Sequence, residues 1–238
     1  MSTRTVREIR GELRVLGNKE KAAHAQGFFK TGKGEYGEGD KFLGIRVPEL
    51  RALAKRYKDF SLDKSLDLLH SRWHEERLLA LLIMVSIYKR AQSDAERKRV
   101  YTAYLANTAH INNWDLVDLS AHLIVGPYLE HRSRKPLYKL AKSKSLWERR
   151  IAIIATYHYI RAGDFDDTLA IADRLLHDNE DLIHKAVGWM LREVGNRDRK
   201  VEVAFLKTRY PSMPRTMLRY AIEKFPEPTR KRYLKGTV

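Results

Sequence analysis

The stretch WHEERLLALLI, residues 73–83, returns in altered form as WERRIAIIA at residues 147–155. Each copy carries a Trp, then an acidic residue, then an Arg, and then an apolar face that contains Ala. In and just after the first copy, the apolar residues Leu78, Leu81 and Val85 follow one another at intervals of three and four positions. This spacing is typical of an α-helix that buries one face. The two stretches therefore predict similar helices that recur along the chain.

The prolines favour an all-helical chain, because proline is unfavourable inside a helix and tolerated in its first turn. All seven are expected at helix boundaries: Pro48, Pro127, Pro136, Pro211, Pro214, Pro226 and Pro228. We predict about twelve helices, near 3–15, 19–30, 48–57, 62–70, 73–90, 94–108, 114–129, 134–142, 146–161, 165–177, 180–195 and 199–209, with one or two more at 213–235. The expected N-caps are Ser61, Ser93, Asn113, Ser145 and Asp164.

An internal repeat is indicated by four residues that each lie near the start of the second helix of an expected pair, Arg77, Trp114, Arg150 and Lys185. Their spacings are 37, 36 and 35 residues, a period typical of stacked helical hairpins. The sequence therefore predicts an all-α solenoid of HEAT-like helical hairpin repeats, forming a single domain over residues 1–238. We expect these positions to line a concave face, where cations and an aromatic ring suit a nucleic-acid backbone.

The charge of the chain points to a polyanionic partner. The 238 residues include 46 Lys and Arg against 30 Asp and Glu, giving a net charge of +16. Half of this excess lies in the basic C-terminal part, residues 197–238. Nucleic acid is the commonest such partner, an anionic membrane surface is the rival, and a merely solubilising surface is the third interpretation. The hydrophobic content of 43% allows a core and argues against global disorder.

Several classes of protein are excluded or disfavoured. The absence of cysteine excludes disulfides, thiol nucleophiles, Cys-ligated zinc and iron–sulfur clusters. The longest apolar run, residues 78–85, is too short to span a bilayer, and the N-terminal residues are charged where a signal peptide is apolar. His70 and His74 have metal-ligand spacing, but no HExxH pattern surrounds them. We therefore expect a soluble, cytoplasmic, monomeric protein without a metal or an organic cofactor.

Residues 30–43, KTGKGEYGEGDKFL, form a glycine-rich segment that interrupts the helical pattern. Its glycines favour a hairpin or a flexible loop over a helix. The segment lacks the GK[ST] ending of a phosphate-binding loop, which argues against nucleotide hydrolysis. Lys30, Lys33, Tyr36 and Lys41 make it a candidate for probing a DNA groove or strand junction, and a plain interhelical loop is the alternative.

Trp114 and Asp118 lie four residues apart in NNWDLVD, so they share one face of a helix that Asn113 is expected to cap. Trp189 and Arg150 would add a second aromatic face and a guanidinium. A carboxylate that faces a deoxyribose stabilises the oxocarbenium-like charge that builds as an N-glycosidic bond breaks. Aromatic faces attract a cationic base, and arginine binds phosphate. The alternative is that both Trp side chains are core residues and that Asp118 only complements the helix N-terminus.

The chain resembles the DNA alkylation repair family, the AlkD-like HEAT-like-repeat DNA glycosylases, over about residues 5–225. The segments that carry the resemblance are FLGIRVPELR (42–51), NNWDLVD (112–118), LWERRIAII (146–154) and HKAVGWMLRE (184–193). The resemblance implies a helical solenoid that binds DNA through a basic concave face and excises cationic N3- and N7-alkylpurines without flipping the base into a pocket. It also implies that Trp114 and Trp189 cradle the lesion nucleotide, that Asp118 is the catalytic carboxylate, and that Arg150 contacts a phosphate.

The glycine-rich segment departs from the founding pattern of that family. It resembles a branch of the superfamily that carries a hairpin at the groove entrance and is associated with branched DNA. The sequence therefore leaves open a monofunctional alkylpurine glycosylase acting on double-stranded DNA, without a lyase step, and a non-catalytic binder of branched or distorted DNA. A solenoid scaffold for an acidic protein partner is a third hypothesis. The predicted DNA-binding residues are Arg150, Arg149, Arg77, Lys185, Arg192, Lys30, Lys33, Tyr36 and Lys41.

Overall fold

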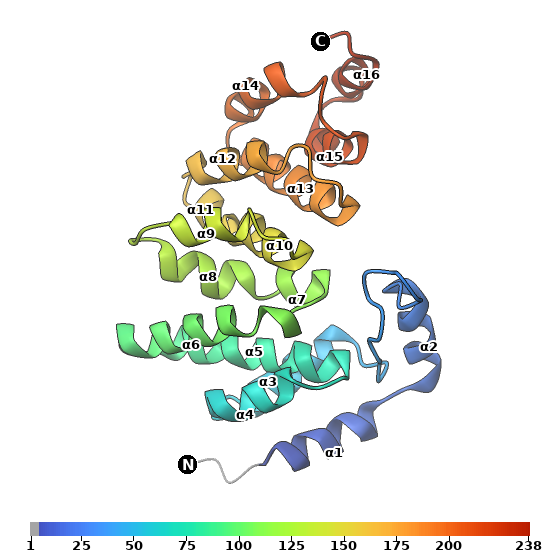
Figure 1. The fold of residues 1–238 in the computed structure, drawn as a ribbon, viewed down its shortest axis with the longest axis vertical. Coiled ribbons are helices and arrows are strands. Elements are labelled where there is room, and N and C mark those ends of the chain that lie inside the picture. The colour runs from blue at the N-terminus through green and yellow to red at the C-terminus, as the bar shows by residue number, and fades with distance from the viewer. Residues whose placement is uncertain (1–4) are drawn as a thin grey trace. The chain divides into compact units, whose positions relative to one another are not determined.

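The computed structural model describes residues 5–238, which form helices joined by loops and include no β-strand (Figure 1). The prediction of an all-α fold is thus confirmed, and only residues 3 and 4 of the first predicted helix lie outside the described residues. The chain divides into two compact units, residues 1–120 and 121–238, and each is described by itself. The single domain expected over residues 1–238 stays a prediction. Among the described residues, no helix has the length and apolar character needed to cross a membrane.

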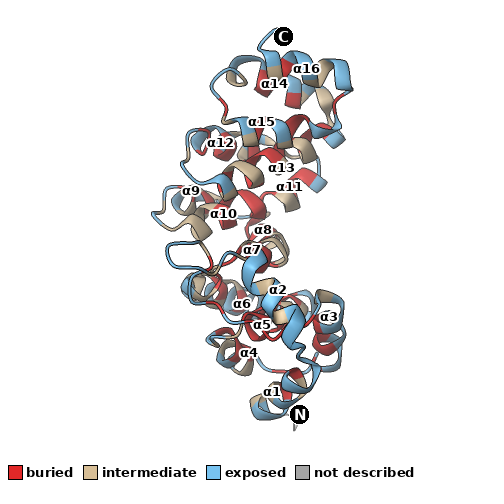
Figure 2. Ribbon diagram, turned by 90° about the vertical axis from the view of Figure 1, so that its right-hand side faces the viewer, coloured by how far each residue is buried: buried red, intermediate tan, exposed pale blue. Residues whose placement is uncertain are grey.

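The first unit is built around one long central helix. Its elements are α1 (Val6–Leu16), α2 (Lys19–Phe28), α3 (Val47–Arg56), α4 (Leu62–Leu69), α5 (His74–Arg90), α6 (Asp94–Ala106), the 3-10 turn η1 (Thr108–His110) and α7 (Trp114–Asp118). Helix α5 packs against α3, α4, α6 and α7, and it is buried on nearly every side (Figure 2). The stretch WHEERLLALLI therefore lies at the centre of this unit, and its apolar residues form much of the core.

The second unit repeats this plan around α13. Its elements are α8 (Ala121–Leu129), α9 (Lys135–Leu140), α10 (Leu146–Ala155), α11 (Tyr157–Arg161), α12 (Asp166–Arg174), α13 (Asp181–Arg197), α14 (Arg199–Arg209), α15 (Arg215–Ala221), the 3-10 turn η2 (Ile222–Lys224) and α16 (Glu227–Lys235). Helix α13 packs against α10, α11, α12, α14 and α15. In each unit shorter helices pack around the central helix and cover its apolar side chains, as in stacked helical hairpins.

Four of the five predicted N-caps are confirmed. Ser61, Ser93 and Ser145 each accept a hydrogen bond from the backbone N–H of the third residue of the following helix, at 3.2, 3.2 and 3.4 Å. Asn113 caps α7 by accepting from the N–H of Trp114 at 2.8 Å. These bonds satisfy backbone donors that the helix itself leaves without partners.

The fifth predicted N-cap, Asp164, is wrong. Phe165 occupies that position before α12 and makes no side-chain cap. The carboxylate of Asp164 instead accepts from Arg134 at 2.7 Å, and the guanidinium of Arg134 lies over the ring of Tyr159 at 3.8 Å. With Arg134 both partners of Asp164 are charged, whereas a backbone N–H at a cap is a neutral donor, so the carboxylate points toward the guanidinium.

The helices predicted at 114–129 and 146–161 are both interrupted in the structure. The first breaks between α7 and α8, where the Ser120 hydroxyl donates to the carbonyl of Leu116 at 2.5 Å. The second breaks at Thr156, whose hydroxyl donates to the carbonyl of Ile153 at 2.7 Å. Hydroxyls that bond to the preceding turn compete with the helical backbone and bend or end helices. Apolar periodicity continues across both breaks, which is why the pattern predicted single helices.

Pro127 lies inside α8, so its predicted place at a helix boundary is wrong. The helix ends two residues later at Leu129, and the missing N–H of Pro127 therefore costs a hydrogen bond only in the last turn. The other predicted boundary prolines agree with the structure, since Pro48, Pro136 and Pro228 lie in first turns, Pro214 and Pro226 are N-cap residues, and Pro211 follows α14.

The close packing of α13 on α15 requires a glycine. A Cβ atom added to Gly188 would lie 2.4 Å from the carbonyl oxygen of Met217 and 2.5 Å from the Cβ of Tyr220. The first of these atoms belongs to the backbone, which cannot move aside without shifting α15.

Replacing this glycine should therefore destabilise the second unit. We expect Gly188→Ala to lower the free energy of unfolding by about 1–3 kcal/mol, because it overpacks a helix interface. Gly11→Ala in α1 is the matched control, since a Cβ there meets nothing within 4 Å, and a gain of about 0.5–1 kcal/mol is expected from helix propensity. Urea melts followed by circular dichroism measure both, and equal effects of the two substitutions would contradict the packing argument.

Glu202 is a buried acid in the second unit. It is 1% exposed, and one of its oxygens lies 3.8 Å from Arg199. Burial raises the pKa of Glu202 to about 8, although the charges of Arg199 and Arg192 oppose the shift. The folded state therefore keeps a proton that the unfolded chain has released above its ordinary pKa of about 4.5. Stability must fall as the pH rises between these two values, and the loss is complete above about 8.

The amide in Glu202→Gln removes this titration while keeping the size of the side chain. We expect the melting temperature of the variant, relative to the wild type, to rise with pH across the interval from about 5 to 8 and then to level off. The expected gain is a few degrees at the upper end, which differential scanning calorimetry resolves. A difference in melting temperature that does not change with pH would show that Glu202 is ionised throughout.

Candidate functional site

Helix α7 carries the two residues on which the predicted chemistry depends in the first unit. Asn113 is fully buried and holds the first turn, while Leu116 and Val117 anchor the helix in the core. Trp114 and Asp118 are both half-buried and, being four residues apart, lie on the same face of the helix. The predicted pairing of an aromatic ring with a carboxylate on one helix face therefore agrees with the structure.

The indole of Trp114 is packed against the end of α2. Phe29 stacks on it with ring centroids 5.4 Å apart and an angle of 16° between the planes, and Phe28 meets it edge-on at 6.2 Å. Phe29 also stacks on Phe42 at 5.0 Å. These phenylalanines are not among the predicted site residues, although the adjacent pair in GFFK, at the end of a helix with no buried residue, is a signal for an aromatic contact.

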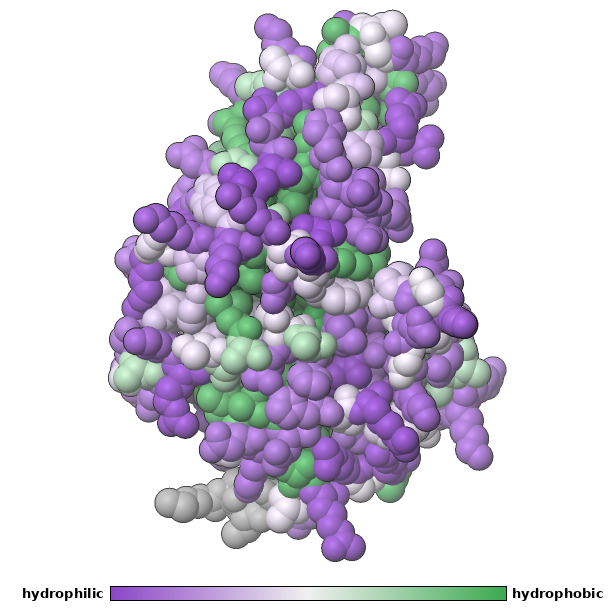
Figure 3. Space-filling view, viewed as in Figure 1, coloured by the Kyte–Doolittle hydropathy of each residue, from purple (hydrophilic) through white to green (hydrophobic). Residues whose placement is uncertain are grey.

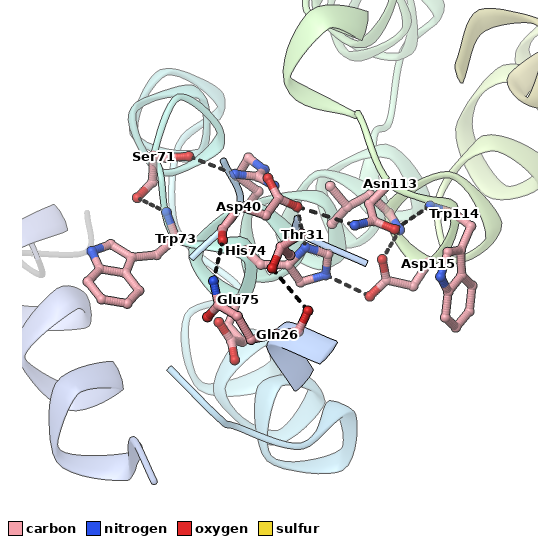
Figure 4. A network of polar contacts seen from close by, with 12 residues as sticks. Gln26, Thr31, Asp40, Ser71, Trp73, His74, Glu75, Asn113, Trp114 and Asp115 are labelled. Atoms are coloured by element: carbon pink, nitrogen blue, oxygen red, sulfur yellow. Dashed lines mark hydrogen bonds and ion pairs between the residues drawn. The ribbon is translucent and has the colours of Figure 1, made fainter. Parts of the chain in front are cut away.

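A buried polar cluster lies behind α7 and is made of Asp40, His74, Arg77, Asn113 and Asp115 (Figure 4). His74, which is 2% exposed, contacts Asp115 through Nε2 at 2.8 Å and Asp40 through Nδ1 at 3.3 Å. Arg77 donates to the other oxygen of Asp40 at 2.7 Å, and the amide of Asn113 donates to Asp40 at 3.2 Å. We call this group the His74 cluster. In Figure 4 the indole of Trp114 lies beyond Asp115, outside the cluster.

The charges of this cluster fix the protonation of its members. Burial by itself lowers the pKa of His74, but the charge of Asp115 and the hydrogen bonds to Asp115 and Asp40 raise it to about 9. For Asp40 burial acts in the opposite direction and raises the pKa, but the hydrogen bond to His74 and the charge of Arg77 hold this pKa below its ordinary value. At neutral pH the cluster therefore contains an imidazolium between carboxylates, and both ring N–H groups donate.

Glu75 fixes the backbone at the end of the glycine-rich segment and just after it. Its buried carboxylate accepts from the backbone N–H groups of Leu43, Gly44 and Ile45, at 2.8, 2.7 and 3.2 Å. This loop and α2 border a cavity of about 480 Å³, which reaches His74 and Asp115 and is lined mainly by apolar groups. The motif FLGI is thus held by a side chain of the motif WHEER.

The glycine-rich segment consists of consecutive tight turns. Glu35 and Glu38 fold back so that their carboxylates accept from the N–H groups of Gly32 and Gly34, both at 2.8 Å. Its end is joined to the start of α5 by an isolated bridge between Lys41 and Trp73. Instead of the predicted hairpin or flexible loop, the segment is a series of turns. Its start is held by the bond from the Gly37 N–H to the Lys30 carbonyl, and its end by the bridge to Trp73. Its predicted DNA-binding residues Lys30, Lys33 and Lys41 are exposed, and Tyr36 is half-buried.

Trp189 belongs to the second unit, on α13. Its Nε1 donates to Glu193 at 3.3 Å, and its ring centroid lies 6.0 Å from that of Tyr157. The side chain is half-buried, so part of the indole reaches the surface of this unit. Trp114 and Asp118 lie in the first unit, and their convergence with Trp189 stays a prediction.

The predicted DNA-binding arginines have partners inside the protein. Arg77 and Arg150 are each 4% exposed, Arg77 within the His74 cluster and Arg150 donating to the backbone carbonyl of Leu182. Arg149 forms a two-pronged ion pair with Asp178 at 2.6 and 3.2 Å. Arg192 is paired with Glu223, and Lys185 with Asp181 at 2.8 Å. Their role toward DNA stays a prediction, while the structural role of the two buried guanidiniums is plain.

The two histidines with metal-ligand spacing have different partners. Nε2 of His70 lies 2.6 Å from the amide oxygen of Asn107, and its ring packs on His110 at 4.5 Å, whereas His74 belongs to its own cluster. Over residues 5–238, no three acidic, His or Cys side chains are grouped as a metal would require. The spacing of these histidines thus reflects two separate polar contacts, one of His70 at the end of α4 and one of His74 at the start of α5.

Comparison with known proteins places these features in a family. No curated protein matches this chain. A solved structure described as a "Predicted DNA alkylation repair enzyme from Enterococcus faecalis" is similar with a TM-score of 0.67 and 18% identity, over 89% of this chain and 97% of that one. This likeness shows the fold and confirms the predicted fold class. The model of the family described as "DNA alkylation repair enzyme" matches residues 9–225. The chain therefore belongs to the DNA alkylation repair enzyme family.

Proposed function

We propose that this protein is a monofunctional DNA glycosylase that hydrolyses the N-glycosidic bond of cationic N3- and N7-alkylated purines in DNA. The observation that carries the proposal is the placement of Trp114 and Asp118 on one half-buried face of α7, in a chain of the DNA alkylation repair enzyme family. The helix that bears them is fixed from behind by the His74 cluster. A carboxylate held in this way is pre-organised for electrostatic stabilisation.

The chemistry needs a carboxylate more than an acid. An alkylated purine already carries a positive charge, so the C1′–N bond breaks with its electron pair moving to the base, which leaves as a neutral molecule. Positive charge then develops on the sugar, and Asp118 stabilises it and orients a water molecule. The water oxygen bonds to C1′, and its proton passes to the solvent. No covalent enzyme intermediate and no lyase step are required.

The aromatic side chains have a separate task in this proposal. The face of an indole attracts a cationic base, and the attraction is stronger where water is excluded. Phe28 and Phe29 remove water from one side of Trp114, which favours this use of the ring. Trp189 supplies the corresponding aromatic surface in the second unit. Hydrophilic side chains dominate the surface in Figure 3, and the net charge of +16 supports binding to the phosphate backbone.

The proposal predicts that base release depends on Asp118. We expect Asp118→Asn to lower the single-turnover rate of release of N7-methylguanine and N3-methyladenine by about 100-fold or more, since one stabilising charge is lost. Asp63→Asn, at an exposed carboxylate in α4, should leave the rate unchanged. Chromatography of free bases from methylated duplex DNA measures both variants.

Two results would redirect the assignment. If the wild type binds DNA but releases no base, and prefers a four-way junction to a duplex, the non-catalytic binder of branched DNA replaces this proposal. If the wild type binds neither the duplex nor the four-way junction, the hypothesis of a scaffold for an acidic protein partner is favoured. Equal rates for Asp118→Asn and the wild type would mean that another group stabilises the sugar.

Arg150 has a further predictable behaviour, because its guanidinium is buried against the backbone of the second unit. We expect Arg150→Gln to cost about 1–3 kcal/mol of unfolding free energy, the value for a buried charged hydrogen bond. Arg192→Gln, at an ion pair with an exposed partner, should cost less than about 1 kcal/mol. Urea melts measure stability, and filter binding measures DNA affinity. An unchanged stability with weakened DNA binding for Arg150→Gln would identify it as a phosphate contact.

A further inference from the structure

One residue of the glycine-rich segment, Asp40, enters the core of the first unit. Asp40 is 5% exposed and contacts three other members of the His74 cluster, His74, Arg77 and Asn113. These partners lie 34, 37 and 73 residues further along the chain. A segment that only joined α2 to α3 would have no need of a buried carboxylate, because taking a charge out of water is costly even where it is paired.

The turns of the segment hold Asp40 in this place. The backbone N–H of Asp40 donates to the carbonyl of Gly37 at 3.0 Å, and the side chain of Gln26 donates to the carbonyl of Asp40 at 3.0 Å. The backbone N–H of Gly37 donates to the carbonyl of Lys30 at 3.1 Å. A Cβ atom added to Gly37 would lie 2.5 Å from the carbonyl oxygen of Phe29. The segment is therefore closed on itself next to Phe29, with Asp40 directed inward.

The same segment reaches α7 by two routes. The polar route runs from Asp40 through His74 to Asp115, and from Asp40 directly to the N-cap Asn113. The aromatic route runs from Phe29, just before the segment, onto Trp114. Both routes end on residues of, or next to, the helix that carries Asp118.

We propose that Asp40 and His74 are positioning residues for α7, and that the glycine-rich segment serves to place Asp40 in the core, where it holds Trp114 and Asp118 in register. The effect on base release rests on the proposed function, whereas the effect on the geometry of α7 does not. The rival role of the segment, probing DNA with its exposed lysines, makes the opposite forecast for affinity and rate.

The first experiment separates rate from affinity. We expect Asp40→Asn to lower the single-turnover rate of base release by about 10–100-fold, as a small misplacement of catalytic groups does, with the Kd for methylated duplex unchanged within about twofold. Lys33→Gln tests the rival role and should weaken DNA binding if the segment probes DNA. Asp63→Asn is the inert control. A weaker affinity with an unchanged rate in Asp40→Asn would overturn the proposal.

The second readout is the pH profile, which a purely structural role would not move. The charged groups around His74 are Asp40 and Asp115 in contact, Arg77 and Glu75 on its own helix, and Lys21, His24 and Arg46 across the cavity. The imidazolium alone bridges both carboxylates, so the rate should fall as His74 loses its proton near pH 9. Asp40→Asn removes one group that raises the pKa of His74, and the fall should move to lower pH. An unmoved profile would contradict the bridge.

A milder variant covers the case in which Asp40→Asn does not fold. Asn113→Ser keeps an oxygen that caps α7 and removes only the amide that reaches Asp40. Asn113→Ser should lower the rate of base release by about 3–10-fold with an unchanged Kd for DNA. This loss is smaller than the one expected for Asp40→Asn, because a neutral hydrogen bond is removed and not a charge.

An assay without DNA separates this proposal from the proposed function. In the ¹H–¹⁵N NMR spectrum, the indole signal of Trp114, assigned with Trp114→Phe, should shift in Asp40→Asn while the signal of Trp189 stays in place. If the wild type releases no base and the Trp114 signal shifts, the proposed function fails and the positioning role stands. If the Trp114 signal does not shift, the positioning role fails whatever the activity.

Discussion

The imidazolium of His74, held between Asp40 and Asp115, is the interaction on which the site in the first unit depends. With Arg77 the cluster contains two cations and two anions, so its formal charge is balanced in the core. Burying these four charges is favourable only as a set, since removal of one partner leaves another uncompensated. The cluster therefore adds little to stability for its size, but it tolerates only one arrangement of the three segments that meet there. Specification of a single geometry is a known use of buried polar groups.

The aromatic rings complete this constraint. Phe42 stacks on His74 at 4.7 Å, Phe29 stacks on Phe42, and Trp114 stacks on Phe29. Because these rings exclude water from the imidazolium, the interaction of His74 with its carboxylates is strengthened. The position of Trp114 thus depends on the charge pairs indirectly, through a column of rings that begins at His74. The end of α2 and the start of α5 are parts of the same construction, although they are far apart in sequence.

Local sequence patterns predicted the helices and most of their starts, because periodicity and capping depend on residues within a few positions of one another. The same patterns missed the breaks at Ser120 and Thr156. At each break a single hydroxyl bonds to the preceding turn and interrupts the helix, although the apolar period continues. The site was predicted in part. Trp114 and Asp118 share a face because their spacing requires it, whereas Asp40 and Phe29 were missed since their partners lie far along the chain. The repeat spacing predicted Arg77 and Arg150 on a DNA-binding face, and only the fold reveals that their guanidiniums are buried.

The proposed chemistry explains why such a rigid support would be placed behind one short helix. A cationic leaving group needs little assistance, so the protein has to supply only a negative charge at the point where positive charge develops on the sugar. The strength of that stabilisation falls with distance, and it is lost if the carboxylate turns toward water. A helix of five residues has few hydrogen bonds of its own to resist such movement. The charged cluster and the ring column supply from outside the helix the rigidity that its length cannot provide.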